Sequence, residues 1–242
     1  MGGRHDHGTA AEVHHGHRSV TGGEARAAVF GASDGLVSNV SLILGVAGAD
    51  VGADIVRVTG LAGLVAGAVS MAAGEWVSMQ AQRELLEREL ARERRELERN
   101  PRGEAAELAE LYRSRGLDPE RAQAVADAIA DDVDIALDVH AREELGVDPD
   151  SLGAPLGAAA SSFGAFAVGA VIPLAPWFFA SGTAAIITSL VLAVVAAAVL
   201  GGLLAVYTTR SIVRSAVRQV LIAAGAAGVT YVVGALVGVN VT

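Results

Sequence analysis

One acidic side chain lies in a stretch of sequence where an acid is costly. Residues 29–49 read VFGASDGLVSNVSLILGVAGA, an apolar run that contains Asp34 and Asn39. A charged side chain at the centre of a bilayer costs about 2.5–3.5 kcal/mol on insertion scales, and carboxylates kept there mark ion or proton pathways. Asn39 and the nearby serines add further oxygen atoms. We therefore expect Asp34 and Asn39 to line such a pathway.

A second apolar run carries candidate metal ligands at helical spacing. Within GLVAGAVSMAAGEWVSMQ, the residues Met71, Glu75 and Met79 follow one another at intervals of four, which places them on one helical face. Thioether sulfur beside carboxylate oxygen suits Fe²⁺ or Mn²⁺ and suits Mg²⁺ poorly. The alternative is that the methionines fill gaps in the core and that Glu75 lies at the headgroup boundary.

Three pairs of candidate ligands lie in the charged segment that follows. Glu93 and Glu96 are three residues apart, Glu104 and Glu107 repeat that spacing, and His140 and Glu144 are four apart. Paired carboxylates on facing helices hold iron-type metals in helical bundles. Charged runs on helices are also the usual composition of solvated faces, so the pattern alone leaves both interpretations open.

The elements that carry these residues are expected to be membrane-spanning helices. The chain has 242 residues, of which 52% are hydrophobic and 4% aromatic. Five apolar segments, each long enough for about 30 Å of hydrocarbon, lie near residues 28–48, 57–79, 155–180, 183–206 and 215–239. Pro173 and Pro176 should kink or end the third segment, with Trp177 at the membrane interface. Residues 1–24 contain five histidines and no apolar run, which predicts a disordered polar tail, with weak metal capture by the histidines as the alternative.

Charge is concentrated between the second and third apolar segments. Residues 80–150 hold 20 of the 27 acidic residues and 11 of the 18 arginines, and residues 151–242 contain no acid. This acidic balance argues against nucleic acid as a partner and favours a cation. With a cytoplasmic N-terminus, five spans leave 17 of the 18 arginines inside and only Arg57 outside, as the positive-inside rule expects. Residues 80–150 would then be cytoplasmic and the C-terminus would lie outside.

The charged segment has the composition of a helical domain. No helix breaker precedes Asn100, so the second apolar segment should continue into the domain as one long helix. A second helix should cover residues 104–116, and a third should begin at an aspartate cap and cover residues 118–146. Apolar residues along the three helices, Leu85 and Ile135 among them, would form a small core.

These motifs together resemble one known family. GASDGLVSNVSLILGVAGA, GLVAGAVSMAAGEWVSMQAQ and the glutamate-rich segment ending HAREELG are similar to stretches of the vacuolar iron transporters, and the bacterial branch has the most similar pattern. The resemblance implies a homodimer of five-helix subunits that exports Fe²⁺, in some branches Mn²⁺, from the cytoplasm in exchange for protons. It matches Asp34 to an intramembrane aspartate and Met71 to a pore methionine. It also matches five residues to cytoplasmic metal-binding glutamates: Glu93, Glu96, Glu104, Glu107 and Glu144.

Two positions depart from the pattern of the plant members. Gly63 stands where they carry a pore glutamate, which leaves the ligand set and the proton coupling open. His140 and Ala141 stand where they carry methionines, so imidazole replaces soft sulfur and could change the metal preference.

The sequence thus predicts an all-α polytopic membrane protein with five transmembrane helices and a cytoplasmic three-helix metal-binding domain inserted between helices 2 and 3. Residues 25–79 and 151–242 would form the membrane part, and residues 80–150 the domain. We expect Fe²⁺ or Mn²⁺ as cargo without a prosthetic group, and a homodimer in the bacterial inner membrane. Glycines such as Gly31 and Gly35 would let two copies approach closely.

Two other functions are weighed against transport. The first is a membrane-tethered protein that stores or senses iron. The second is an iron-oxidising enzyme, which is disfavoured because such sites use paired Glu-x-x-His motifs and the spacing of His140 and Glu144 differs.

Overall fold

Five long apolar helices form the larger part of the protein. The structure is a computed structural model that describes residues 23–149 and 154–239; most of the predicted tail, residues 1–24, lies outside the described residues. The long helices are α1 (Gly23–Gly48), α2 (Ala53–Arg99), α6 (Pro155–Leu174), α7 (Gly182–Tyr207) and α8 (Ile212–Val239). Each is long and apolar enough to cross a membrane, which confirms the five predicted segments. All regular elements in the described residues are helices.

Helices α1, α2 and α6 pack together because glycines remove the side chains between them. A Cβ atom at Gly35 would lie 2.1 Å from the backbone oxygen of Phe166, and one at Gly169 would lie 2.2 Å from that of Ala32. Gly31 is packed in the same way, 2.7 Å from the oxygen of Ser162 on α6. Gly31 and Gly35 therefore face α6 of the same chain, and the prediction that they serve the approach of a second copy is wrong.

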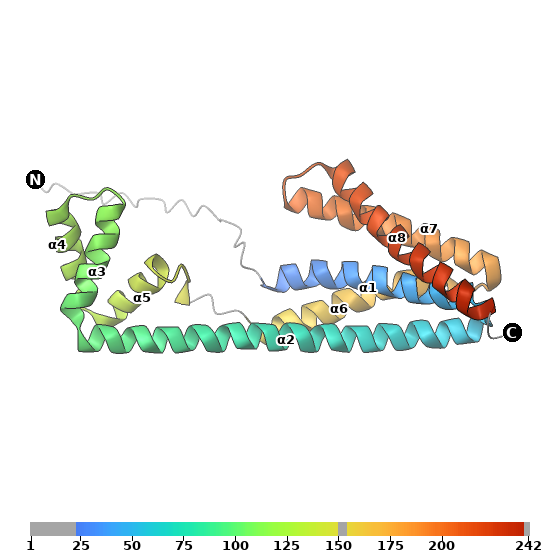
Figure 1. Cartoon of the computed structure of the whole chain (residues 1–242), viewed down its shortest axis with the longest axis horizontal. Coiled ribbons are helices and arrows are strands. Elements are labelled where there is room, and N and C mark those ends of the chain that lie inside the picture. The colour runs from blue at the N-terminus through green and yellow to red at the C-terminus, as the bar shows by residue number, and fades with distance from the viewer. Residues whose placement is uncertain (1–22, 150–153, 240–242) are drawn as a thin grey trace, which may run out of the picture.

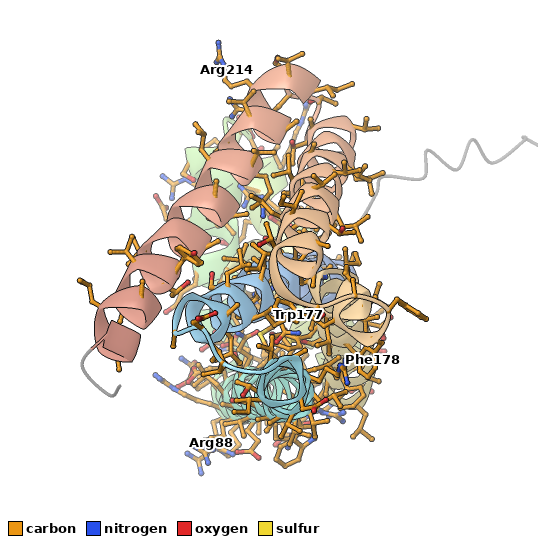
Figure 2. The ribbon with its side chains drawn as sticks, turned by 90° about the vertical axis from the view of Figure 1, so that its right-hand side faces the viewer. Arg88, Trp177, Phe178 and Arg214 are labelled. Carbon is orange, nitrogen blue, oxygen red and sulfur yellow. The ribbon has the colours of Figure 1, made fainter. Side chains whose placement is uncertain are left out.

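Helices α7 and α8 cover the side of α1 that is turned away from α2 (Figures 1 and 2). Leu36, Val40 and Leu44 of α1 form a core there with alanines of α7 and α8. Gly234 of α8 lies against Gly45 so closely that a Cβ atom would meet a backbone oxygen at 1.7 Å. The opposite face of α8 is exposed and apolar, as expected for a helix in contact with lipid or another apolar surface.

The helix α2 is about 70 Å long by its 47 residues, more than twice the thickness of a hydrocarbon core. The prediction of one uninterrupted helix is confirmed. Its apolar first half packs against α1 and α6, and its charged second half extends away from the bundle (Figure 1). It ends at Asn100, whose side chain accepts a hydrogen bond from Gly103 N and caps the next helix.

The charged segment contains three short helices besides the end of α2. These are α3 (Pro101–Ser114), α4 (Pro119–Ala130) and α5 (Val133–Glu143). The predicted single helix over residues 118–146 is wrong because Asp132 interrupts it: its carboxylate accepts hydrogen bonds from Asp134 N and Ile135 N, and so begins α5 as a separate helix. The break lets α4 pack on α3 while α5 folds back onto α2 (Figure 1).

The core of this domain is smaller than predicted. Ala105, Leu108, Ala122 and Ala126 are buried between α3 and α4. Leu85 and Ile135, both predicted to be in the core, are 60% and 54% exposed. The domain is therefore held by alanine packing, by helix caps and by its attachment to α2.

The third apolar helix ends near its prolines as predicted, at Leu174, and a 3₁₀ turn η2 (Ala175–Phe178) follows. Trp177 does not lie on the surface of the bundle. It is 2% exposed and packs with Ile43, Val56 and Leu174 (Figure 2). Its ring fills the interior of the bundle at the end of α6, and its position at the membrane interface stays a prediction.

Candidate functional site

A cavity of about 450 Å³ lies between α1, α2 and α6. Four of the residues predicted to line a pathway, Asp34, Asn39, Met71 and Glu75, lie in its wall. Asp34 and Asn39 come from α1, and Met71 and Glu75 from α2, which packs beside it. The fold thus brings carboxylate, amide and thioether groups from two apolar helices to one space.

Asn39, in the cavity wall, has an oxygen atom without a hydrogen-bond partner among the described residues. Its Nδ2 donates a hydrogen bond of 2.7 Å to the backbone oxygen of Ala170, which fixes the orientation of the amide. Its Oδ1 is buried and accepts no hydrogen bond from the described residues. A buried acceptor without a partner costs free energy comparable to a lost hydrogen bond, so a cation in the cavity would satisfy it.

Two lining positions carry no side chain, which lets neighbouring side chains pack directly against the backbone of α2. A Cβ atom at Gly63 would lie 2.4 Å from Leu42 and 3.1 Å from Asn39 Oδ1. A Cβ atom at Gly67 would lie 2.2 Å from the ring of Phe166. Phe166, 2% exposed, closes the cavity on the α6 side. Sequence analysis missed it, because in sequence it looks like the other apolar residues of α6.

The remaining residues of the predicted α2 face behave differently from Met71. Glu75 lies in the cavity wall and forms an ion pair with Arg26 of α1, with 2.7 Å between Oε1 and Nη2. Met79 is not in the wall. It is buried against Ala27 and Ala158, one turn further along α2, where it fills a gap between α1, α2 and α6.

A second group of ligand atoms lies beside the charged part of α2. Oxygens of Glu93 and Glu104 and a ring nitrogen of His140 lie within 4.8 Å of one another. The three residues come from α2, α3 and α5, so only the fold of the domain brings them together. Nδ1 of His140 is 3.1 Å from Glu93 Oε1 and 3.1 Å from Glu144 Oε1. We call Glu93, Glu104, His140 and Glu144 the acidic cluster.

The acidic cluster is buried and its atoms are poorly satisfied. His140 is 1% exposed, and Glu93 and Glu104 are 9% exposed. Glu93 Oε1 and His140 Nδ1 lie at hydrogen-bonding distance, but their directions do not form a hydrogen bond. Neither atom forms a hydrogen bond with any other described residue, although Nδ1 also lies 3.1 Å from Glu144 Oε1. Atoms that converge without bonding one another fit a shared cation.

The electrostatics of the acidic cluster also favour a cation. Burial raises the pKa of Glu93, and His140 opposes this change. The negative charges of Glu144, Glu96 and Glu107 raise the pKa of Glu93 further. Burial likewise raises the pKa of Glu104, with Glu107 and Glu93 adding to it. A positive ion at the centre would remove both penalties, because it replaces lost solvation and offsets the repulsion between carboxylates.

Glu96 and Glu107 lie at the margin of the acidic cluster. Glu96 accepts a hydrogen bond of 3.1 Å from Arg92 on the same helix. Both are near enough to act on the pKa of Glu93 and Glu104, although neither belongs to the group within 4.8 Å. They surround the cluster with negative charge, and their role as ligands stays a prediction.

Other acids of the segment form ordinary exposed pairs. Glu87 pairs with Arg83, and Glu110 pairs with Arg113, both at helical spacing. Such surface pairs are worth at most about 1 kcal/mol and need no ligand. The acidic cluster differs from these pairs in burial and in joining three helices.

The cavity and the acidic cluster are connected by one rigid element. From Glu75 to Glu93 the helix α2 runs 18 residues without a break, about 27 Å at 1.5 Å per residue. The two groups therefore lie along the same axis and cannot change their spacing unless α2 bends.

Comparisons with known proteins find similarity along most of the chain. The profile of the VIT family matches residues 25–235. The vacuolar iron transporter of Acanthamoeba castellanii is 42% identical over 161 residues, which are 65% of this chain and 58% of that protein. Vacuolar iron transporter 1 of Oryza sativa subsp. japonica is 31% identical over 90% of this chain and 87% of its own length. Vacuolar iron transporter 1 of Eucalyptus grandis is 31% identical over 90% and 88%.

Proposed function

Because the chain belongs to the VIT family, we propose that it is a membrane transporter that exports Fe²⁺, and also Mn²⁺, from the cytoplasm in exchange for protons. The observation that carries the proposal is the cavity between apolar helices that contains Asp34, Met71 and the unpartnered Oδ1 of Asn39. The acidic cluster at the other end of α2 supports it, because it offers a place to capture the ion first.

In this proposal the acidic cluster collects the cation and the cavity carries it across. Oxygen and imidazole ligands in the cluster suit Fe²⁺ and Mn²⁺, and the thioether of Met71 favours them over Mg²⁺. Metal ligands must be deprotonated, so loading the ion onto Asp34 releases a proton and protonation of Asp34 releases the ion. A tenfold proton gradient supplies about 1.4 kcal/mol for each proton exchanged.

The arginines give the orientation that we propose. The cytoplasmic side would hold the N-terminus, residues 80–150, the α7–α8 turn with Arg210 and the start of α8 with Arg214, and the C-terminus would lie outside. The membrane would be the inner membrane of a bacterium, although the relatives are named for the vacuole. Two copies would assemble through the exposed apolar face of α2, which carries Val58, Val65 and Val69.

Transport into proteoliposomes tests the proposal. Purified protein is reconstituted with a metal-sensitive dye inside, an acidic interior is imposed, and Mn²⁺ or Fe²⁺ is added outside. Asp34→Asn should abolish metal uptake and the accompanying proton release. Asp50→Asn is the matched control, since Asp50 lies in the exposed α1–α2 turn with a positive φ of 56°, which asparagine tolerates. Full uptake by Asp34→Asn would refute the pathway.

Storage without transport is the second candidate, and the acidic cluster favours it because the cluster could hold an ion by itself. If the protein only stores metal, the Asp34→Asn variant should bind Mn²⁺ normally, and the unmodified protein should give no Mn²⁺ uptake into proteoliposomes. Removal of residues 80–150 would abolish every activity of a store, whereas a transporter should keep slow residual uptake. We propose no enzymatic activity.

A further inference from the structure

The ion pair between Arg26 and Glu75 lies at the end of the cavity that faces the charged domain. Glu75 is the last residue of α2 in the cavity wall before the helix runs on to Glu93. Arg26 lies one helical turn before Phe30, which is the first wall residue of α1. An ion that leaves the acidic cluster and enters the cavity along α2 therefore meets this pair first.

The two partners are unequally buried. The side chain of Glu75 is 12% exposed, and that of Arg26 is 64% exposed. The guanidinium thus reaches in from the surface and neutralises a carboxylate that has lost most of its water. Beside the pair, Ala27, Met79 and Ala158 fill the space between α1, α2 and α6. The pair therefore lies between the cavity and this packed layer.

We infer that Arg26 is a charge-selective latch, which occupies Glu75 until a divalent cation displaces it. A divalent ion attracts a carboxylate twice as strongly as a monovalent ion at the same distance. A monovalent ion gains no Coulomb advantage over the tethered guanidinium already 2.7 Å from the oxygen, whereas a divalent ion does. Arg26 would thereby determine which cations enter, and it acts through Glu75 rather than as a ligand. The inference rests on the proposed transport function.

A single introduced thiol tests the latch without measuring transport. The chain has no cysteine, so Ser38→Cys places one thiol in the cavity wall. In lipid nanodiscs, the rate of its modification is measured with a cationic trimethylammonium-ethyl methanethiosulfonate and with the anionic sulfonatoethyl reagent. Asp34 and the acidic cluster remain intact throughout.

In the Ser38→Cys protein, Arg26→Gln should raise the rate of thiol modification by the cationic reagent and lower the rate of modification by the anionic reagent. Because Ser38 is 12 residues beyond Arg26 on α1, the charge acts on the reagent as it passes residue 26. At roughly 7 Å from the passing reagent, loss of one unit charge changes each rate about threefold in water. Arg26→Lys, which keeps the charge, should behave as the parent. Arg83→Gln is the matched control and should change nothing, since Arg83 forms an exposed pair with Glu87 beyond the cavity.

Unchanged rates in Arg26→Gln would overturn the inference. Equal acceleration of both reagents would also overturn it, because the pair would then be a steric plug without charge selectivity. A change in the cationic-to-anionic ratio supports the latch even if Asp34→Asn transports normally, so failure of the proposed pathway and failure of the latch are distinguishable. A purely structural tie between α1 and α2 would alter the melting temperature and leave this ratio unchanged.

Discussion

Replacement of Glu93 by glutamine should have opposite effects on the stability of the metal-free protein and on metal binding. The Glu93 carboxylate has an oxygen within 4.8 Å of one on Glu104. Two unit charges at that distance repel by about 1 kcal/mol in water and about 3.5 kcal/mol at an effective dielectric constant of 20. Glutamine keeps the shape and removes the charge, so the metal-free protein should gain about 1–3 kcal/mol.

The same substitution removes a charged ligand from the acidic cluster. An ion present at 100 times its dissociation constant stabilises the protein by about 2.7 kcal/mol. A tenfold or greater loss of affinity removes at least about 1.4 kcal/mol of that stabilisation. Melting curves of the full-length protein with and without Mn²⁺ measure both effects. In Glu93→Gln, the melting midpoint without metal should rise by at least about 2 °C, and the increase in midpoint caused by Mn²⁺ should become smaller.

Glu98→Gln is the matched control, because Glu98 lies on the same helix, carries the same charge and is exposed. It should change neither the metal-free midpoint nor the metal-induced shift. The reasoning is refuted if Glu93→Gln lowers the metal-free midpoint and leaves the Mn²⁺ shift intact. That result would identify Glu93 as a structural partner of His140.

The pH dependence of the metal-free protein provides a second measurement of the same effect. The pKa values of Glu93 and Glu104 are raised above the ordinary glutamate value of 4.5, so the folded state holds their protons more tightly than the unfolded state. The stability that these two carboxyl groups contribute is fully present below pH 4.5 and is lost as the pH rises through their raised folded-state pKa values. Glu93→Gln should flatten this part of the profile, whereas Mn²⁺ affinity should fall with acid because protons compete for the ligands.

Two further substitutions test the packing of the cavity and the fold of the domain. Gly67→Ala should cost about 1–3 kcal/mol by overpacking and reduce uptake, since its Cβ would lie 2.2 Å from Phe166. Gly225→Ala is the control: a Cβ atom at Gly225 would meet nothing within 4 Å, so this variant should stabilise the protein by up to about 1 kcal/mol in thermal unfolding. Asp132→Ala should cost about 1 kcal/mol and weaken Mn²⁺ binding measured by calorimetry, because α5 carries a ligand. Asp118→Ala removes the cap of α4 at a similar cost; an equal loss of Mn²⁺ affinity there would contradict the role of α5.

The sequence by itself determined the helices. Apolar length located the five long helices, and the absence of a breaker before Asn100 predicted that α2 continues into the charged segment. These features depend on residues adjacent in the chain, through hydrophobic length, proline geometry and cap hydrogen bonds. The same local logic missed the break at Asp132, because an aspartate within a helical pattern can either cap a new helix or stay solvated.

Only the tertiary structure decided which residues share a site. Glu93, Glu104 and His140 come from three helices. The sequence named them together with Glu96 and Glu107, and only burial and the approach of their ligand atoms within 4.8 Å separate them from those two glutamates. Met71 and Met79 look equivalent in sequence, yet one lines the cavity and the other packs against alanines, because α1 and α6 approach α2 differently at each turn. Close approaches between distant segments depend on how side chains pack in three dimensions, and the order of residues along one helix does not specify them.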